Sequence, residues 1–289
     1  MTIAISLKVN DGLVLAADSA STIIGYTEEG DPTNVVNVYN NANKIANLRK
    51  GLPIGVVTWG AGSIGPASIS TLMKDLRRRF AGKDPEHASW HLDPDAYTIE
   101  AVATRLREFV YEETYRVAFG EWPPERQPFL GFLVGGYGAG ESLADEFQVL
   151  IANGECGPPV AIRPHEDAGI IWNGEIEAIS RLLIGFGNAL PQVLTDQLAV
   201  PGDQVPAIID VLRSSLEQRL VHAAMPIQDA IDLAGFLADL TIGVSRFAEG
   251  APTVGGEIEI AAVTKHEGFK WVRRKHYFSP DLNVKEADV

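Results

Sequence analysis

Residues 2–18, TIAISLKVNDGLVLAAD, predict a β-hairpin near the start of the chain. Two apolar runs lie on either side of Asn10-Asp11-Gly12, and a short Asx-Gly turn between two such runs is a strong hairpin signal. Thr2 stands directly before the first predicted strand and Asp18 directly after the second. The opening of the chain therefore combines a strand pair with a hydroxyl and a carboxylate.

Thr2 has the chemistry of a nucleophile if it becomes the first residue. Methionine is normally removed when a small residue follows it, so the mature chain could begin with Thr2. A threonine at a free N-terminus carries a hydroxyl and an α-amine, whose ordinary pKa of about 7.7–8 suits a general base at neutral pH. The alternative is that Thr2 merely begins a strand, as β-branched residues often do.

Two further segments continue the pattern of strands and glycines. Residues 44–48, KIANL, and residues 52–58 predict strands, and Gly60-Ala61-Gly62 follows the second of them. Near the other end of the chain, residues 255–264 read GGEIEIAAVT, which is two glycines followed by a strand.

In this order and spacing, these segments resemble the catalytic N-terminus of proteasome β-type subunits. That family belongs to the N-terminal nucleophile (Ntn) hydrolases, and it includes the bacterial proteasome-like peptidases of the HslV and Anbu types. The resemblance is closest over about residues 2–65, patchy to about 200, and recognisable again over about 230–265. It implies an α+β fold, a four-layer α-β-β-α sandwich with two antiparallel sheets, in one domain over residues 1–275 with a tail at 276–289.

The resemblance also implies roles for individual residues. Thr2 Oγ would attack an amide carbonyl, Lys44 would keep the Thr2 amine neutral, and Asp18 would pair with Lys44. The backbone N–H of Gly60 would donate to the oxyanion.

In the family, the substrate lies extended between two main-chain edges. Here these edges would be Ser21-Thr22 and Gly60–Gly62, with Thr58 facing the pocket for the residue before the cut.

The chain departs from the family in three places. Residues 27–32, TEEGDP, lie in a stretch between Asp18 and Lys44 that is some ten residues longer than usual, and they predict an acidic hairpin loop. Ala251 and Val254 stand where the family has an acid and a serine that support the threonine. Residues 185–188, GFGN, lie where it has a serine between glycines. These departures leave open whether the chain is active.

A dinucleotide site is the main alternative reading of the glycines. Residues 60–65, GAGSIG, match G-x-G-x-x-G after a strand and before a helix. However, the fingerprint also needs a strand after that helix, and residues 81–91 are polar. No P-loop and no G-x-S-x-G motif occurs, and the six histidines predict no metal site. We therefore expect neither a metal nor a cofactor.

Composition narrows the remaining possibilities. The net charge of −14 argues against nucleic acid as a partner, and the basic residues cluster only at 77–79 and 273–275. One cysteine, Cys156, fits a reducing cytoplasm, and neither a membrane-spanning run nor a secretory signal is visible. We expect helices over residues 66–80, 96–118, 176–199, 204–221 and 227–245, and further strands over 129–137, 146–152, 256–264 and 268–273.

The sequence thus predicts a threonine-type peptide or amide hydrolase. An exposed threonine nucleophile would endanger other proteins, so we expect a self-compartmentalised homo-oligomer, a ring or an open-ring stack, with Thr2 inside and with contacts near residues 66–80 and 96–118. The substrate would be a peptide or an unfolded protein, and an ATP-dependent unfoldase partner has no support in this sequence. Two alternatives stay open: a non-catalytic subunit that retains Met1, and a small-molecule amidase.

Overall fold

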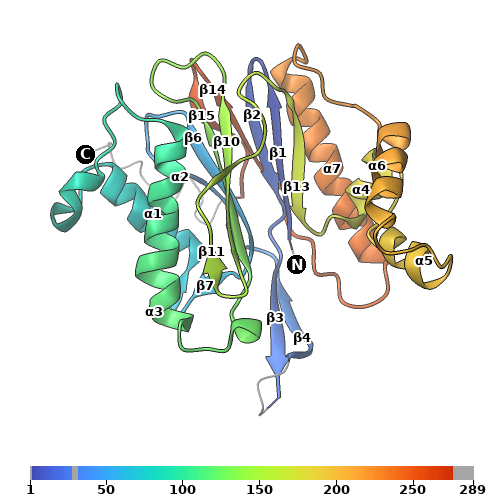
Figure 1. Cartoon of the computed structure of the whole chain (residues 1–289). Helices are drawn as coiled ribbons and strands as arrows, with labels where there is room; N and C mark the ends of the chain where they lie inside the picture. The colour runs from blue at the N-terminus through green and yellow to red at the C-terminus, as the bar shows by residue number, and fades with distance from the viewer. Residues whose placement is uncertain (1, 28–31, 276–289) are drawn as a thin grey trace.

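The computed structural model describes residues 2–27 and 32–275. Met1, the centre of the predicted acidic loop (residues 28–31) and the predicted tail (276–289) lie outside the described residues. Within the described part, every strand pairing is antiparallel, and the elements form two large sheets, two small hairpins and several helices (Figure 1).

The first sheet contains the N-terminal hairpin. Its strand order is β13-β1-β2-β14-β15. The register pairs Ala4 with Ala17 across the hairpin and Ile5 with Trp172 on the other side of β1. The strands are β1 (Ile3–Val9), β2 (Gly12–Ala17), β13 (Gly169–Gly174), β14 (Glu259–Thr264) and β15 (Gly268–Arg273).

The second sheet has the order β11-β10-β9-β6-β5, and a short strand, β12, also pairs with β10. Two small hairpins, β3–β4 and β7–β8, stand apart from both sheets. The strands of the second sheet are β5 (Ile45–Asn47), β6 (Ile54–Gly60), β9 (Leu130–Gly136), β10 (Asp145–Ala152), β11 (Glu155–Cys156) and β12 (Val160–Ala161). Those of the hairpins are β3 (Ser21–Tyr26), β4 (Pro32–Tyr39), β7 (Ser63–Ile64) and β8 (Ala67–Ser68).

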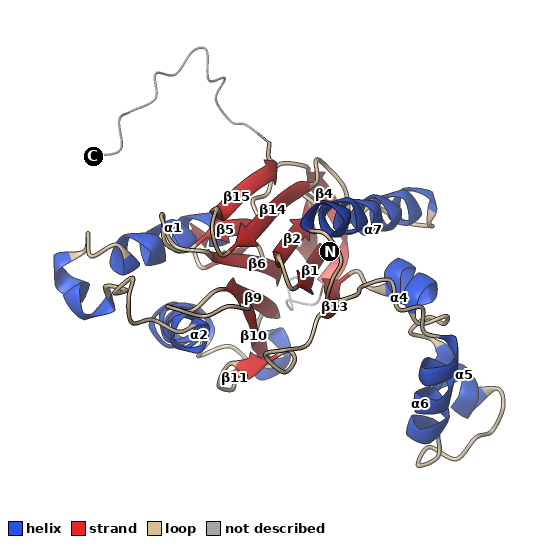
Figure 2. Ribbon diagram, turned by 90° about the horizontal axis from the view of Figure 1, so that it is seen from above, coloured by secondary structure: helices blue, strands red, loops and turns tan. Residues whose placement is uncertain are grey.

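Helices cover the outer faces of the two sheets, whereas α5 and α6 extend outward beyond α4 (Figures 1 and 2). The helices α1 and α2 cover the second sheet, and α4 and α7 cover the first. The α-helices are α1 (Ile69–Phe80), α2 (Ile99–Arg107), α3 (Arg116–Phe119), α4 (Glu177–Leu183), α5 (Leu190–Asp196), α6 (Val205–Leu216) and α7 (Ile227–Phe247). The other helical segments are a π-helix at Glu108–Tyr115 and 3-10 turns at Pro85–Trp90 and Pro124–Arg126.

Three apolar clusters hold these parts together. One cluster lies between the second sheet and α1 and α2, another between the first sheet and α4 and α7, and the third joins the two sheets. Because side chains alternate along a strand, Ile5 and Leu7 of β1 face α7, whereas Ala4 faces the other sheet. The third cluster includes Leu13, Leu15, Val57, Leu133 and Val263.

Several predicted helix boundaries need correction, and among them the helix predicted over 204–221 ends at Leu216 and the one predicted from residue 96 begins at Ile99. The first helix begins at Ile69 and not at residue 66, because the preceding residues form the β7–β8 hairpin and Ser68 caps the helix by accepting from Thr71 N at 3.2 Å. The helix predicted over 176–199 is two helices, α4 and α5, because the chain turns at Gly185, whose φ of +89° is in the left-handed region.

The structure also rules out a dinucleotide fold at residues 60–65. Strand β6, which leads into them, pairs antiparallel with β5 and β9, and the residues that follow enter the β7–β8 hairpin instead of a helix. A parallel βαβ unit is therefore not formed there. In the part of the chain that is described, no helix has the length and apolar character needed to cross a membrane.

Candidate active site

Thr2 is held firmly by the chain around it. Its side chain is buried, and its carbonyl accepts a hydrogen bond from Glu175 N at 2.6 Å. Gly174, at the end of β13, has φ +90°, and a Cβ added there would lie 1.9 Å from Thr2 O. Only glycine fits at that position, so the end of β13 packs directly against the backbone of Thr2.

Asp18 connects three segments beside Thr2. Its Oδ1 accepts from Ile3 N at 3.1 Å, and its Oδ2 accepts from Ala20 N at 3.1 Å and from Gly255 N at 3.0 Å. The carboxylate is fully buried. The predicted Gly-Gly segment is thus tied to the N-terminal hairpin through this one side chain.

Lys44 completes this arrangement. Its Nζ lies 2.6 Å from Asp18 Oδ1, in a buried ion pair. Burial lowers the pKa of Lys44 below its ordinary value of 10.5, and the charge of Asp18 and the hydrogen bond to it oppose that change. The structure therefore brings Lys44 and Asp18 together next to the residue that follows Thr2. The separation of Lys44 Nζ from Thr2 Oγ stays a prediction.

A second buried ion pair, which the sequence analysis missed, lies beside the first. Lys275 Nζ lies 3.5 Å from Glu259 Oε2 and donates to Ser19 Oγ at 2.6 Å and to the carbonyl of Ala42. Burial raises the pKa of Glu259 and lowers that of Lys275, and in each case the partner's charge opposes the effect. The charge of Lys275 also contributes to lowering the pKa of Lys44, so the two pairs are electrostatically connected.

A signal for this second pair was present in the sequence. Glu259 lies inside an apolar strand and, as the structure shows, is almost completely buried. A carboxylate at such a position requires a partner. Lys275 could not be identified as that partner, because it lies beyond β15 at the point where the tail was predicted to begin.

Gly60 ends strand β6 with φ +93°. A Cβ at this position would lie 2.4 Å from the carbonyl oxygen of Phe129, and the next residue, Ala61, donates to that same carbonyl at 2.9 Å. Glycine is therefore required by the backbone here. The orientation of Gly60 N toward Thr2 stays a prediction.

The predicted substrate-binding residues come from two neighbouring segments. A Cβ added to Gly62 would lie 3.6 Å from Ser21 Oγ, so the end of β6 and the start of β3 face each other. Thr22 follows Ser21 in β3. Thr58 is buried in β6, where its N donates to Lys44 O at 2.9 Å and its Oγ1 to Gly131 O at 3.0 Å. Thr58 is thus tied to the Lys44 backbone, and its hydroxyl already has an acceptor within the second sheet.

Ala251 and Val254, two of the predicted departures, carry no polar side chain, and Val254 N donates to Ser245 Oγ at 3.4 Å. Val254 is buried in the apolar cluster under α7, and Ala251 is exposed. In the 185–188 segment, Asn188 N donates to Glu177 Oε2 at 2.8 Å. That segment is therefore held to α4.

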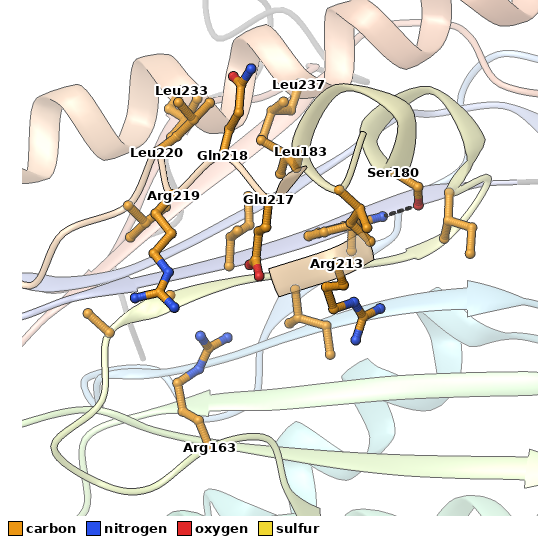
Figure 3. Close-up of a pocket in the computed structure, with 18 of the residues that line it drawn as sticks. Arg163, Ser180, Leu183, Arg213, Glu217, Gln218, Arg219, Leu220, Leu233 and Leu237 are labelled. Atoms are coloured by element: carbon orange, nitrogen blue, oxygen red, sulfur yellow. Dashed lines mark hydrogen bonds between the residues drawn. The ribbon is translucent and has the colours of Figure 1, made fainter. Parts of the chain in front are cut away.

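A separate cavity lies elsewhere in the fold. Its volume is about 1100 Å³, and it opens between β13, α4, the end of α6 and α7 (Figure 3). The three candidate catalytic residues, Thr2, Asp18 and Lys44, do not line this cavity. Figure 3 shows Arg163, Arg213 and Arg219 around it together with Glu217, and Ser180 accepts from the Trp172 indole at 3.2 Å on its wall. Among the residues that the structure describes, no group of three or more His, Cys, Asp or Glu side chains is placed to hold a metal ion.

Comparison with known proteins establishes the fold. Anbu (ancestral beta-subunit) from Yersinia bercovieri is similar over 95% of this chain and 88% of that chain, with a TM-score of 0.51 and 15% sequence identity. The Anbu (Gly-1) mutant from Hyphomicrobium sp. strain MC1 matches over 95% and 86%, with a TM-score of 0.49 and 16% identity. No protein-family model and no curated protein sequence matches. The predicted resemblance is confirmed as structural similarity to Anbu, in a mixed α+β fold with antiparallel sheets.

Proposed function

We propose that this chain is a threonine-type peptide or amide hydrolase built on the four-layer Ntn-hydrolase sandwich. The observation that carries the proposal is the buried pair of Lys44 and Asp18, whose shared Oδ1 also binds Ile3 N directly after Thr2. A buried ion pair costs desolvation energy. Its position beside a candidate nucleophile is therefore a reason to assign it a catalytic role.

The proposed reaction begins at a Thr2 that has lost Met1. Thr2 Oγ attacks the substrate carbonyl carbon, and its proton passes to the Thr2 α-amine through a water. The carbonyl oxygen becomes an oxyanion, to which Gly60 N–H donates a hydrogen bond worth roughly 3–4 kcal/mol in comparable sites. The Thr2 α-amine then passes this proton to the nitrogen of the substrate, which leaves as an amine when the C–N bond breaks. A second water hydrolyses the ester between Thr2 and the substrate and so restores the Thr2 hydroxyl.

Lys44 and Asp18 support this chemistry electrostatically. A cationic Lys44 disfavours protonation of the nearby α-amine, because like charges repel. Asp18 favours the cationic form of Lys44 and so opposes the lowering of its pKa by burial. Asp18 itself is held in place by the three backbone N–H groups that donate to its carboxylate. The substrate backbone would lie between Ser21-Thr22 and Gly60–Gly62, two segments that face each other at Ser21 and Gly62.

We also propose that the chain assembles into a homo-oligomer, a ring or an open-ring stack with Thr2 facing inward. Exposed apolar side chains support this assembly. They occur on α3 (Val117), on α7 (Phe236 and Phe247) and on the β3–β4 hairpin (Ile23 and Val36), which extends away from the body in Figure 1. Helices α1 (69–80) and α2 (99–107) carry no exposed large apolar side chain, so α3 and α7 are the stronger candidates for contacts. The single cysteine supports a cytoplasmic location.

The second candidate function is a non-catalytic subunit of such an assembly. It is favoured by Val254, which is packed among apolar side chains where the family has a polar group that supports the threonine. In that case Met1 would remain, and the Thr2 amine would be unable to act as a base.

Two measurements separate these functions. The intact mass of the purified chain reports whether Met1 is present. Hydrolysis of a fluorogenic peptide library then compares wild type with Thr2→Ala and Thr2→Ser, each checked by circular dichroism. We expect loss of Met1, turnover by wild type and no turnover by Thr2→Ala. Retained Met1 without turnover would support the non-catalytic subunit, and full turnover by Thr2→Ala would exclude the mechanism.

Sedimentation tests the assembly independently. At micromolar concentration we expect species much larger than the 31.2 kDa chain. A monomer that still cleaves small amides would favour the small-molecule amidase instead.

A further inference from the structure

A second cavity, of about 370 Å³, lies between α1, β5 and the β14–β15 turn. In a chain with a net charge of −14, its lining is strongly basic. Five cationic residues contribute to it, and the acidic residues that line it are Glu259 and Glu267. The cationic residues are Lys50, Lys74, Arg77, Lys270 and Arg274.

This cavity joins the two basic clusters of the sequence. Arg77 comes from the cluster at the end of α1, and Arg274 comes from the cluster after β15. Basic residues at the C-terminus of a helix are explained by the helix dipole. The helix dipole explains the exposed Arg78. It does not explain why Arg77 lies in the same cavity as Arg274, which comes from the other end of the chain.

Among the described residues, no carboxylate lies within ion-pair distance of Arg77, Arg274, Lys74 or Lys270. Arg77 Nε donates to Asn47 O at 2.7 Å, and Arg274 stacks on the Trp271 ring at 4.7 Å. Burial lowers the pKa of Arg77, and the positive charge of Arg274 lowers it further. Like charges are therefore placed together in this cavity.

The two acids offset only part of the positive charge of the five cationic residues. Glu259 is buried and already paired with Lys275, and Glu267 is bonded to Thr264. Guanidinium forks are suited to binding phosphoryl oxygens in pairs, and the two guanidinium and two ammonium groups that line this cavity supply the positive charge that a phosphoryl group requires.

We propose that this cavity binds the phosphoryl group of free phosphate or of a small phosphorylated compound. Arg77 and Arg274 bind the phosphoryl oxygens, and Lys74 and Lys270 add charge at the rim. The volume leaves room for a small organic part beside the phosphoryl group. Thr2, Asp18 and Lys44 do not line this cavity, although Asn43 and Ile45 on either side of Lys44 do. The proposal does not depend on hydrolase activity.

Titration calorimetry at low ionic strength tests the proposal on the full chain. The probes are inorganic phosphate and glycerol 3-phosphate. The variants are Arg77→Gln, Arg274→Gln and Lys74→Gln/Lys270→Gln, and the matched control is Arg78→Gln, which removes the same charge from the residue next to Arg77. We expect saturable binding of phosphate by wild type and by Arg78→Gln, and at least a tenfold loss of affinity in Arg77→Gln and Arg274→Gln.

The double lysine variant guards against misfolding, because Lys74 and Lys270 are exposed and their replacement leaves the core intact. We expect it to weaken binding as well. No phosphate binding by wild type, or an equal loss in Arg78→Gln, would overturn the proposal. Tighter binding of glycerol 3-phosphate than of phosphate would identify a phosphorylated compound as the ligand, and equal binding would identify free phosphate.

Discussion

Asp18 Oδ1 accepts a hydrogen bond from the backbone N–H of Ile3, at 3.1 Å, across the open end of the N-terminal hairpin. The same oxygen accepts from Lys44 Nζ at 2.6 Å. One buried atom therefore connects the backbone next to Thr2 with the candidate catalytic lysine. A change at Asp18 must affect the fold and the site together.

Replacing Asp18 by asparagine should destabilise the chain strongly. The substitution preserves the shape of the side chain but removes the counter-charge of Lys44, and breaking a buried ion pair in this way costs about 3–5 kcal/mol. Urea denaturation followed by circular dichroism measures this loss. Asp11→Asn is the matched control, because Asp11 lies exposed in the hairpin turn and its replacement should change stability by less than about 0.5 kcal/mol. Equal stability of the two variants would show that the pair is not structural.

Lys275→Met should be similarly costly, because it leaves Glu259 buried without its cationic partner. We expect a loss of about 3–5 kcal/mol. Adding Glu259→Gln should recover a large part of this loss, because the unpaired charge is then removed. A double-mutant cycle from urea denaturation gives the coupling free energy. Additive effects of the two substitutions would mean that the residues do not interact.

Gly174→Ala should displace Thr2. An added Cβ would lie 1.9 Å from Thr2 O, and the φ of +90° is unfavourable for alanine in any case. Gly140→Ala is the control, because Gly140 also has a positive φ, +77°, but an added Cβ there meets no atom within 4 Å. The control should lose about 1 kcal/mol, from backbone strain alone. Gly174→Ala should lose clearly more in the same denaturation assay, and a loss equal to that of Gly140→Ala would contradict the close packing against Thr2.

Local sequence signals predicted the parts of the fold that depend on neighbouring residues. The hairpin of residues 2–18 formed as expected, because its turn and its apolar runs are adjacent. The pairing of Asp18 with Lys44 was also predicted, through the resemblance of the segments around them. Strand β13 was not predicted, although it pairs with β1 and packs against Thr2. Its partner lies more than 150 residues away in the sequence, and the segment itself, GIIWNG, is a short apolar run between glycines.

The buried pair of Glu259 and Lys275 was not predicted either, because it also joins residues whose contact depends on the tertiary fold. Glu259 was part of a predicted strand, but which face of that strand would be buried depended on β2, its partner in the first sheet. Lys275 reaches Glu259 only because the chain returns past Ala42 and Ser19 after β15. Contacts of this kind are set by the tertiary fold and leave no periodic pattern in the sequence.

The stability of the chain should carry a pH dependence that comes from Glu259. Burial raises its pKa in the folded chain above the ordinary value of 4.5, while Lys275 and Arg274 oppose that rise. Between 4.5 and the raised pKa, folded Glu259 binds a proton that the unfolded chain has lost. Stability is therefore reduced as the pH rises through this window.

Comparison with Glu259→Gln isolates this effect, because the other carboxylates titrate alike in both proteins. The stability of wild type minus that of Glu259→Gln should fall as the pH rises above about 4.5, by at most about 1.4 kcal/mol per pH unit, and should level off above the folded pKa. Urea denaturation between pH 4 and pH 7 measures this difference, in a range where Lys275 stays protonated in the unfolded chain. A constant difference would mean that Glu259 keeps its ordinary pKa in the folded chain. A difference that grows with pH would mean that its folded pKa is lowered, and the pairing with Lys275 would then outweigh burial.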